Sequence, residues 1–243
     1  MKKMAWLVAG SLTLVACGQG QDQVKLDNDD KKAAYALGFR TGEQMQGRME
    51  GIDLDSFLAG LRDGARGEEA TPQLAKEEMD ATITAFQERK VAEQEAQMAQ
   101  ESDENLAAGA AFRAENLEKE GVKETESGLQ YEVLTAVEGE APQPGADDTV
   151  VAHYHGTLID GTVFDSSVDR GEEATFPLNR VIQGWQEALP MMKVGEKWRI
   201  VLPPHLAYGE TGAGGVIGPN ATLVFDIELI GIEQPGDAAE DDQ

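Results

Sequence analysis

The spacing of apolar side chains divides the chain into a helical first half and a second half of strands. Residues 29–48 carry Tyr35, Leu37, Phe39 and Met45 in a loosely helical pattern, and in 53–66 the residues Phe57, Leu58 and Leu61 have the spacing of one helix face. Asp53 or Asp55 is placed to cap the second segment, and Gly67 to end it. The sequence therefore predicts two short helices in this region.

A much longer helix is expected after them. Thr71 and Pro72 form a suitable start, because threonine can cap a helix and proline fits its first turn. From Pro72 to Glu120 the chain is rich in Ala, Glu, Gln, Lys and Met, which favour helices. A continuous helix over this stretch would be about 70 Å long, with Gly121 in place as a C-terminal cap.

The apolar positions of this long helix thin out toward its middle, where the polar run 101–105 and Gly109 are its weakest points. A helix that is polar nearly all round bridges domains or is unstable alone, so residues 91–124 are predicted to form a stalk helix and linker. Residues 29–90 are richer in apolar groups, but about 60 residues make only a marginal core. We therefore expect 29–90 to form an all-α dimerisation domain, with a monomeric helical domain as the alternative.

The hydrophobic period changes to two in the second half of the chain. Segments 128–134 and 149–159 alternate as half-buried strands do, and 196–202 and 221–233 follow the same pattern. The one short helix candidate covers residues 180–192. Several antiparallel strands and a single helix predict an α+β domain in which the helix lies on one face of the sheet.

The N-terminus adds a targeting signal to this picture. Two lysines precede an apolar run that ends at Ala16 and is shorter than the roughly 20 residues that cross a bilayer. This pattern is typical of a signal peptide. Cys17, the only cysteine, follows in the sequence LVAC, which resembles a bacterial lipobox. We expect Cys17 to be lipidated and Gly18 to favour outer-membrane sorting; ordinary cleavage that leaves a free thiol is the alternative.

The charge of the chain excludes some classes of partner. The formal net charge is −25, and residues 1–16 contain two lysines and no acidic residue, so the cleaved chain carries −27. Such a surface repels nucleic-acid phosphates and anionic lipids. We expect no nucleic-acid partner and attachment to a membrane only through the lipid. The acidic end, 234–243, has no large apolar residue and is predicted to be disordered.

Asp165, Ser166 and Ser167 raise the question of covalent catalysis. A serine nucleophile needs a base within reach and an exposed position such as the G-x-S-x-G elbow. The chain has no G-x-S-x-G, and its three histidines lie in no recognisable triad setting. We therefore expect the two serines to shape a loop.

A metal or phosphate site has equally little support. His153 and His155 share one face of a strand, but two ligands without a third are weak evidence for zinc. The glycine cluster 209–215 lacks the lysine and the strand–loop–helix context of a phosphate loop, and is interpreted as a flexible hairpin loop. No metal and no cofactor is expected.

What remains is a set of aromatic and branched aliphatic residues from separate segments, each of which alone would be taken for core. The set comprises Tyr154, Phe164, Phe176, Val181, Ile182, Trp185, Tyr208, Ile217 and Phe225. They lie in the stretches HYHGTLIDGTVFDSS, FPLNRVIQGWQEALPMMKVGEKWRIVLPPHLAYG and IGPNATLVFDIEL. In the order and spacing of these stretches, residues 125–233 closely resemble FKBP-type peptidyl-prolyl cis-trans isomerases. The helical first half and the IGPN motif look most like the macrophage infectivity potentiator-like bacterial group.

The resemblance implies a strongly curved antiparallel sheet around a short helix, with an apolar pocket between them. It makes Trp185 the pocket floor, and it assigns walls and edges to Tyr154, Phe164, Phe176, Phe225, Val181, Ile182 and Ile217. It implies that Asp165 lies beside the prolyl amide and that Tyr208 and the Ile182 N–H bind substrate carbonyls. His155 stands where threonine is usual, and Ala213 and Gly218 depart from the family in the loop expected over the pocket, so substrate preference is open.

The resemblance implies a prolyl isomerase that assists the folding of extracytoplasmic proteins and stabilises the twisted X–Pro amide without covalent chemistry. The alternative is a holding chaperone or lipoprotein scaffold in which isomerase activity is secondary. Unfolded or proline-containing clients, macrolide inhibitors and a second copy of the chain are the implied partners. The implied location is the outer membrane, lipid-anchored, facing the periplasm or the cell surface.

The predicted organisation is a series of six segments with different roles. These are a signal peptide (1–16), a tether after lipidated Cys17 (17–28), a helical dimerisation domain (29–90), a stalk helix and linker (91–124), an FKBP-type isomerase domain (125–233) and a disordered acidic tail (234–243).

Overall fold

The computed structural model describes residues 24–47, 49–69 and 71–233. They form two compact units, and the boundary along the chain lies between residues 79 and 80. The expected signal peptide, the lipidation site Cys17 and the acidic tail lie outside the described residues. Within the described residues, no helix combines the length and the apolar character needed to cross a membrane.

The first unit contains the two short helices that the sequence predicts. Helix α1 covers Asp29–Met45, and α2 covers Leu54–Gly64, followed by a 3-10 turn, η1, at Gly67–Glu69. Asn28 caps α1 by accepting a hydrogen bond from the Lys31 N–H, and Asp53 caps α2 in the same way through the Ser56 N–H. The expected helix, 53–66 with Gly67 after it, extends two residues too far, because α2 ends at Gly64.

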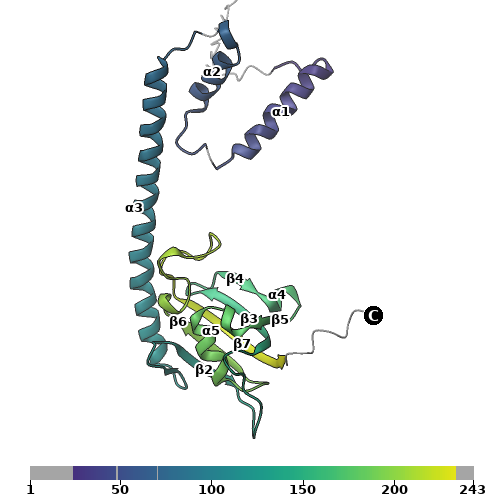
Figure 1. The fold of residues 1–243 in the computed structure, drawn as a ribbon, viewed down its shortest axis with the longest axis vertical. Helices are drawn as coiled ribbons and strands as arrows, with labels where there is room; N and C mark the ends of the chain where they lie inside the picture. The colour runs from purple at the N-terminus through teal and green to yellow at the C-terminus, as the bar shows by residue number, and fades with distance from the viewer. Residues whose placement is uncertain (1–23, 48, 70, 234–243) are drawn as a thin grey trace, which may run out of the picture. The chain divides into compact units, whose positions relative to one another are not determined.

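Helix α3 is continuous from Lys76 to Leu117, 42 residues long, and it runs through both expected weak points (Figure 1). The expected start at Thr71–Pro72 is wrong. The helix begins four residues after Pro72, where Glu77 and Glu78 in the first turn complement the positive end of the helix dipole. Its end also precedes the expected one, and Gly121, at φ +89°, lies in the turn that follows.

The second unit contains a seven-stranded antiparallel sheet, in line with the predicted α+β class. Its main path runs β1-β2-β6-β7-β3-β4, and β5 pairs with β3 beside β4. The strands are β1 (Lys123–Glu124), β2 (Gln130–Thr135), β3 (Thr149–Leu158), β4 (Val163–Ser166), β5 (Ala174–Pro177), β6 (Lys197–Leu202) and β7 (Leu223–Glu233). The four strands that the sequence predicts are present within two residues of their expected bounds at either end. The short strands β1, β4 and β5 were not predicted.

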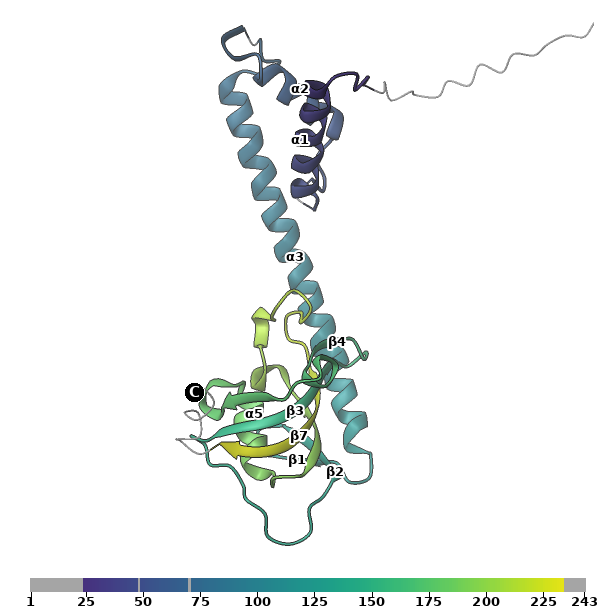
Figure 2. The same ribbon diagram turned by 90° about the vertical axis from the view of Figure 1, so that its right-hand side faces the viewer.

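Strands β3 and β7 form the centre of the sheet and pair along their whole length (Figure 2). The register shifts between Val151 and Ala152 opposite β7, between Gly156 and Thr157 opposite β4, and between Val133 and Thr135 opposite β6. Such irregularities bend a strand and increase its twist. They account for a sheet that curves around its helix.

Helix α5 covers Gln183–Ala188 and lies on the inner face of this sheet. It is shorter than the predicted 180–192 because a 3-10 turn with Pro190 near its start, η3 (Leu189–Met191), takes over. Gly184 permits the close approach, since an added Cβ would lie 2.4 Å from Leu202 Cδ2. The remaining helical elements are α4 (Ser167–Arg170), η2 (Leu178–Arg180), η4 (Pro204–Leu206) and η5 (Gly209–Thr211).

The C-terminal half of α3 packs on the opposite, outer face of the sheet. Phe112 and Asn116 of α3 line a cavity with Arg199 of β6 and Asp226 of β7, whose side chains point away from the core. The side chain of Gln130 is fully buried here, and its amide donates to the Arg113 carbonyl at 3.0 Å and accepts from Asn116 at 3.0 Å. A buried amide needs such partners, so this part of α3 belongs to the second unit.

Candidate active site

A pocket of about 340 Å³ opens between α5 and the inner face of the sheet. Its size falls in the range of small-molecule and peptide side-chain sites. The lining residues are Tyr154, Phe164, Asp165, Phe176, Arg180, Val181, Ile182, Trp185, Tyr208 and Phe225. Nine of these ten are sequence-predicted site residues, and Arg180 is the addition. The structure therefore brings together residues from β3, β4, β5, β7, η2, α5 and two loops that lie far apart in the chain.

Trp185 is the centre of the aromatic cluster in this pocket. Its ring meets Tyr154, Phe176 and Phe225 edge-to-face, with centroid separations of 5.3, 5.4 and 5.3 Å. Aromatic pairs favour this geometry over face-to-face stacking, and it fixes the orientation of each ring. Trp185 is only 4% exposed, and its indole N–H meets no hydrogen-bond acceptor among the described residues. Its ring therefore contributes apolar surface to the pocket.

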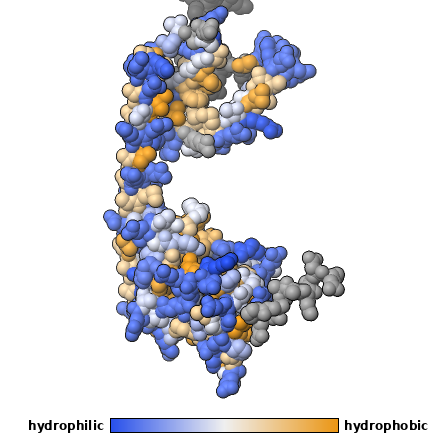
Figure 3. Space-filling model, viewed as in Figure 1, coloured by the Kyte–Doolittle hydropathy of each residue, from blue (hydrophilic) through white to orange (hydrophobic). Residues whose placement is uncertain are grey.

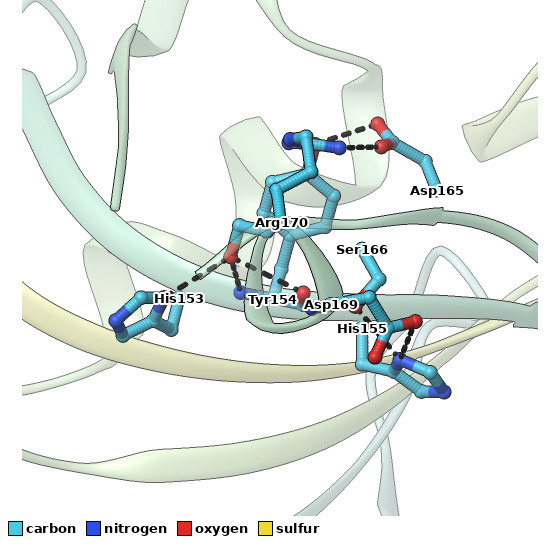
Figure 4. A network of polar contacts seen from close by, with 8 residues as sticks. His153, Tyr154, His155, Asp165, Ser166, Asp169 and Arg170 are labelled. Carbon is cyan, nitrogen blue, oxygen red and sulfur yellow. Dashed lines mark hydrogen bonds and ion pairs between the residues drawn. The ribbon is translucent and has the colours of Figure 1, made fainter. Parts of the chain in front are cut away.

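The polar side of the pocket is a network of Tyr154, Asp165 and Arg170 (Figure 4). The Tyr154 hydroxyl donates to Asp165 Oδ2 at 2.6 Å, and Arg170 donates to Asp165 Oδ1 and, at 2.8 Å, to the Tyr154 oxygen. The guanidinium of Arg170 also lies 5.6 Å from the Tyr154 ring centroid. The carboxylate is thus held in one orientation at the edge of an apolar cavity.

These contacts determine the charge of the site. Partial burial acts to raise the pKa of Asp165, but the hydrogen bonds that Tyr154 and Arg170 donate outweigh it and hold that pKa below its usual value. The pKa of Tyr154 is raised, first by burial and then by the neighbouring carboxylate. At neutral pH the site therefore holds an ionised Asp165 and a neutral Tyr154.

Arg170 is the member of this polar network that sequence reasoning missed. It reaches Asp165 because the one-turn helix α4 folds the chain back, with the Ser166 side chain as N-cap and Gly171 in the left-handed conformation after it. The sequence DSSVDRG contains both signals, since a serine cap and a glycine stop enclose a single turn. That turn places residue 170 beside residue 165.

Ser166 and Ser167 are structural. They are 5% and 0% exposed, so neither hydroxyl is accessible to a substrate. Ser167 Oγ accepts from the Tyr154 N–H at 2.8 Å and contacts His153 Nδ1 at 3.2 Å, and Ser166 Oγ contacts His155 Nδ1 at 3.0 Å. These contacts join the end of β4 and the start of α4 to β3 (Figure 4). Within the described residues, no three His, Cys, Asp or Glu side chains gather in a way that could hold a metal.

Of the predicted residues in the loop after β6, only Tyr208 lines the pocket. Tyr208 lines the pocket and is 40% exposed. Ala213 and Ile217 form an antiparallel bridge at the base of a hairpin, but Ile217 is 8% exposed, packs into the core and does not line the pocket. Gly218 lies against Glu101 and Asn105 of α3. The expectation that Gly218 lies over the pocket is wrong, because α3 occupies the space beside it.

Comparisons with known families agree with this geometry. Residues 140–230 match the family described as FKBP-type peptidyl-prolyl cis-trans isomerase. Residues 30–133 match the family described as the domain amino terminal to FKBP-type peptidyl-prolyl isomerase. The two matches together cover most of the described chain.

Individual proteins are similar over nearly the same length. The chain is 42% identical over 207 residues to the FKBP-type 22 kDa peptidyl-prolyl cis-trans isomerase of Escherichia coli, covering 85% of this chain and 97% of that protein. It is 39% identical over 213 residues to the outer membrane protein MIP of Legionella longbeachae, covering 88% and 90%. The crystal structure of FkpA from Escherichia coli aligns with a TM-score of 0.67 at 40% identity, covering 85% of this chain and 98% of that one.

Proposed function

Because this chain belongs to the FKBP-type peptidyl-prolyl cis-trans isomerase family, we propose that it assists the folding of extracytoplasmic proteins by stabilising the twisted X–Pro amide in its aromatic pocket. One observation carries the proposed mechanism, namely an ionised carboxylate fixed at the edge of a cavity whose other walls are mainly apolar. Proline-containing polypeptides are the substrates of the family.

The energetics of the reaction suit such a site. An X–Pro bond isomerises through a twisted state that lacks amide resonance, over a barrier of about 18–20 kcal/mol. A 10⁴-fold acceleration needs only about 5.5 kcal/mol of transition-state stabilisation. No bond is broken, so the pocket has only to bind the proline ring, disfavour the charge-separated planar amide and hydrogen-bond the twisted form.

We assign the polar groups of the pocket to the twisted amide. Asp165 is the electrostatic partner of the prolyl amide, and Tyr154 and Arg170 hold it in place. Tyr208 and the backbone N–H of Ile182 are assigned to the substrate carbonyls. The Val181 carbonyl, which shares a peptide unit with the Ile182 N–H, accepts a hydrogen bond from Gln186 Nε2 at 2.7 Å, so a side chain of α5 fixes the orientation of this peptide unit. Macrolide inhibitors of the family are expected to compete for the same cavity.

The test is an exchange assay on a short X–Pro peptide, by protease coupling or by NMR. The lipid-free mature chain should accelerate exchange in proportion to its concentration. Absence of any acceleration would overturn the proposed mechanism.

Asp165→Ala is expected to lower kcat/KM on such a peptide by at least about 10-fold, the effect of losing one hydrogen-bonded charge. Stability should change little, because the Tyr154 oxygen keeps its contact with Arg170 and Asp165 is exposed. Asp165→Asn, which keeps the shape but removes the charge, separates the two contributions. Wild-type kcat/KM in the Asn variant would contradict an electrostatic role.

The pH dependence of the rate follows from the depressed pKa of Asp165. A depressed folded-state pKa keeps the carboxylate ionised until the pH falls below the ordinary value of 3.8, so kcat/KM should be flat from about pH 8 to pH 5. In Arg170→Ala the pKa of Asp165 rises, and the acid-side fall in rate moves to higher pH. NMR exchange measures this without a protease. An acid limb that does not move would show that Arg170 does not act on Asp165; Arg170→Lys should give an intermediate shift.

A second candidate function is the holding of unfolded chains by the first unit. Large apolar side chains of α1 and α2 are exposed, and Figure 3 shows patches of hydrophobic surface over these helices. A cavity of about 570 Å³ also lies between α2 and residues 72–79. If the first unit holds unfolded chains, the Asp165→Ala variant should still suppress the aggregation of an unfolded protein. Loss of suppression together with isomerase activity would contradict it.

We propose that the mature chain is anchored in the outer membrane through a lipid on Cys17. The lipobox-like sequence LVAC supports this, as does similarity to a protein named for the outer membrane. Cys17→Ser should abolish the incorporation of labelled fatty acid and release the protein from the membrane fraction. Retention of Cys17→Ser in that fraction would overturn the proposal.

A further inference from the structure

The IGPN motif, which the pocket does not use, is the point where the loop after β6 meets helix α3. The Pro219 carbonyl accepts a hydrogen bond from Asn105 Nδ2 at 2.9 Å. Asn220 Nδ2 donates to Ser102 Oγ at 2.8 Å. Both bonds join residues more than 100 positions apart in the chain, and both involve α3 side chains that are only half-buried. They fix the loop onto one face of α3.

The backbone at this contact is shaped for close approach. Gly109 of α3 is buried against Thr222, and an added Cβ there would lie 2.3 Å from Thr222 Oγ1. An added Cβ at Gly218 would lie 2.1 Å from Glu101 Oε1. Asn220 is the only non-glycine residue with positive φ in the described part of the chain, at +54°. Asparagine tolerates this conformation better than most residues do, so the motif supplies both the geometry and the side-chain contact.

The same residue connects α3 to the active site. The backbone N–H of Asn220 donates to the Gly209 carbonyl at 2.8 Å, and Gly209 follows Tyr208 directly. Tyr208 lines the pocket. The position of Tyr208 therefore depends on the loop backbone, which Asn220 ties to Ser102.

We propose that Ser102, Asn105 and Asn220 form a latch through which helix α3 positions Tyr208 for substrate. These are positioning residues, since none of them lines the pocket. The proposal rests on the isomerase function, in which Tyr208 meets a substrate carbonyl. It gives α3 a role in positioning a residue of the active site.

The test uses Ser102→Ala and Asn220→Gly in the full mature chain. Alanine favours the helix more than serine does, so Ser102→Ala leaves α3 intact, and glycine adopts positive φ without strain. Each variant should lower kcat/KM by about 2- to 10-fold, the effect of one hydrogen bond. Each should change the ratio of kcat/KM between peptides with a small and a bulky residue before proline. The amide resonance of Gly209 should shift in both, and that of Asn220 should shift in Ser102→Ala.

Three controls separate positioning from general damage. Gln100→Ala, an exposed neighbour on α3 that bonds only Glu104, should change neither the rate nor the Gly209 resonance. Ser102→Thr, which keeps the hydroxyl, should restore both. Because Ser102 and Asn220 act through one bond, the double variant should lose no more than the more impaired single variant.

Wild-type kcat/KM in both single variants, or an unchanged Gly209 resonance, would overturn the latch, as would fully additive losses in the double variant. The resonance measurement does not need catalysis. If the protein without substitutions had no isomerase activity, the isomerase proposal would be refuted. The Gly209 resonance would still show whether the latch contact forms.

Discussion

Trp185→Ala is expected to destabilise the second unit by about 3–5 kcal/mol, the usual cost of truncating a large buried aromatic residue. Trp185 is 4% exposed and packs edge-to-face against Tyr154, Phe176 and Phe225, so its removal leaves a cavity below the substrate site. The three rings lose the partner that orients them. Isomerase activity should therefore fall together with stability. Chemical denaturation monitored by far-UV circular dichroism measures the free energy of unfolding.

Trp185→Phe is the matched control for this prediction. The indole N–H has no acceptor among the described residues, so phenylalanine removes ring area without leaving a hydrogen-bond partner unsatisfied. The Phe variant should keep most of the stability and a measurable activity. Asp165→Ala, in contrast, should lose activity without a comparable loss of stability. Equal unfolding penalties for Trp185→Ala and Asp165→Ala would contradict the roles assigned to these residues.

Much of the pocket could be predicted from the sequence, because its residues belong to strands with clear alternation and to stretches of characteristic spacing. Tyr154 and Phe225 lie at buried positions of β3 and β7, where period two already places them on the inner face. Trp185 is on the single helix candidate of the second half. Short elements were harder, since four residues such as those of β4 show too little periodicity to distinguish a strand from a loop.

Contacts between distant segments could not be predicted from these patterns. Ile217 is a branched aliphatic residue, like others of the predicted pocket. The Ala213–Ile217 bridge nevertheless places its side chain in the core. Gly218 stands beside α3, because the apparently weak polar stretch 101–105 is helical and supplies Ser102 and Asn105. Two of its polar side chains, those of Ser102 and Asn105, hydrogen-bond the loop, while Asp103 and Glu104 are exposed. Only the three-dimensional structure distinguishes such a face from a solvent-exposed stalk.

Self-association through the first unit is the remaining prediction with a large effect. No residue of α1 or α2 is buried in the described chain. Their large apolar residues are exposed to an extent unusual for a folded unit, with Phe39 57%, Leu58 44% and Leu61 61% accessible. A symmetric dimer is the commonest way to cover such a face. We therefore expect the lipid-free mature chain to sediment as a dimer at micromolar concentration.

Phe39→Glu and Leu61→Glu should each convert this dimer to a monomer. In a two-fold dimer each substitution removes the side chain from both protomers. Because each buried large apolar group contributes about 1.5–3 kcal/mol, the dissociation constant should rise about 100-fold or more. Leu134→Glu, at an exposed apolar position of β2, is the matched control and should remain dimeric. The monomers should retain activity on short peptides, since the pocket and its contacts with α3 lie in the second unit. They should act less well on an unfolded protein, because two linked sites raise the effective concentration of a client. A monomeric unchanged chain at micromolar concentration would refute the assignment of the exposed face to a second copy.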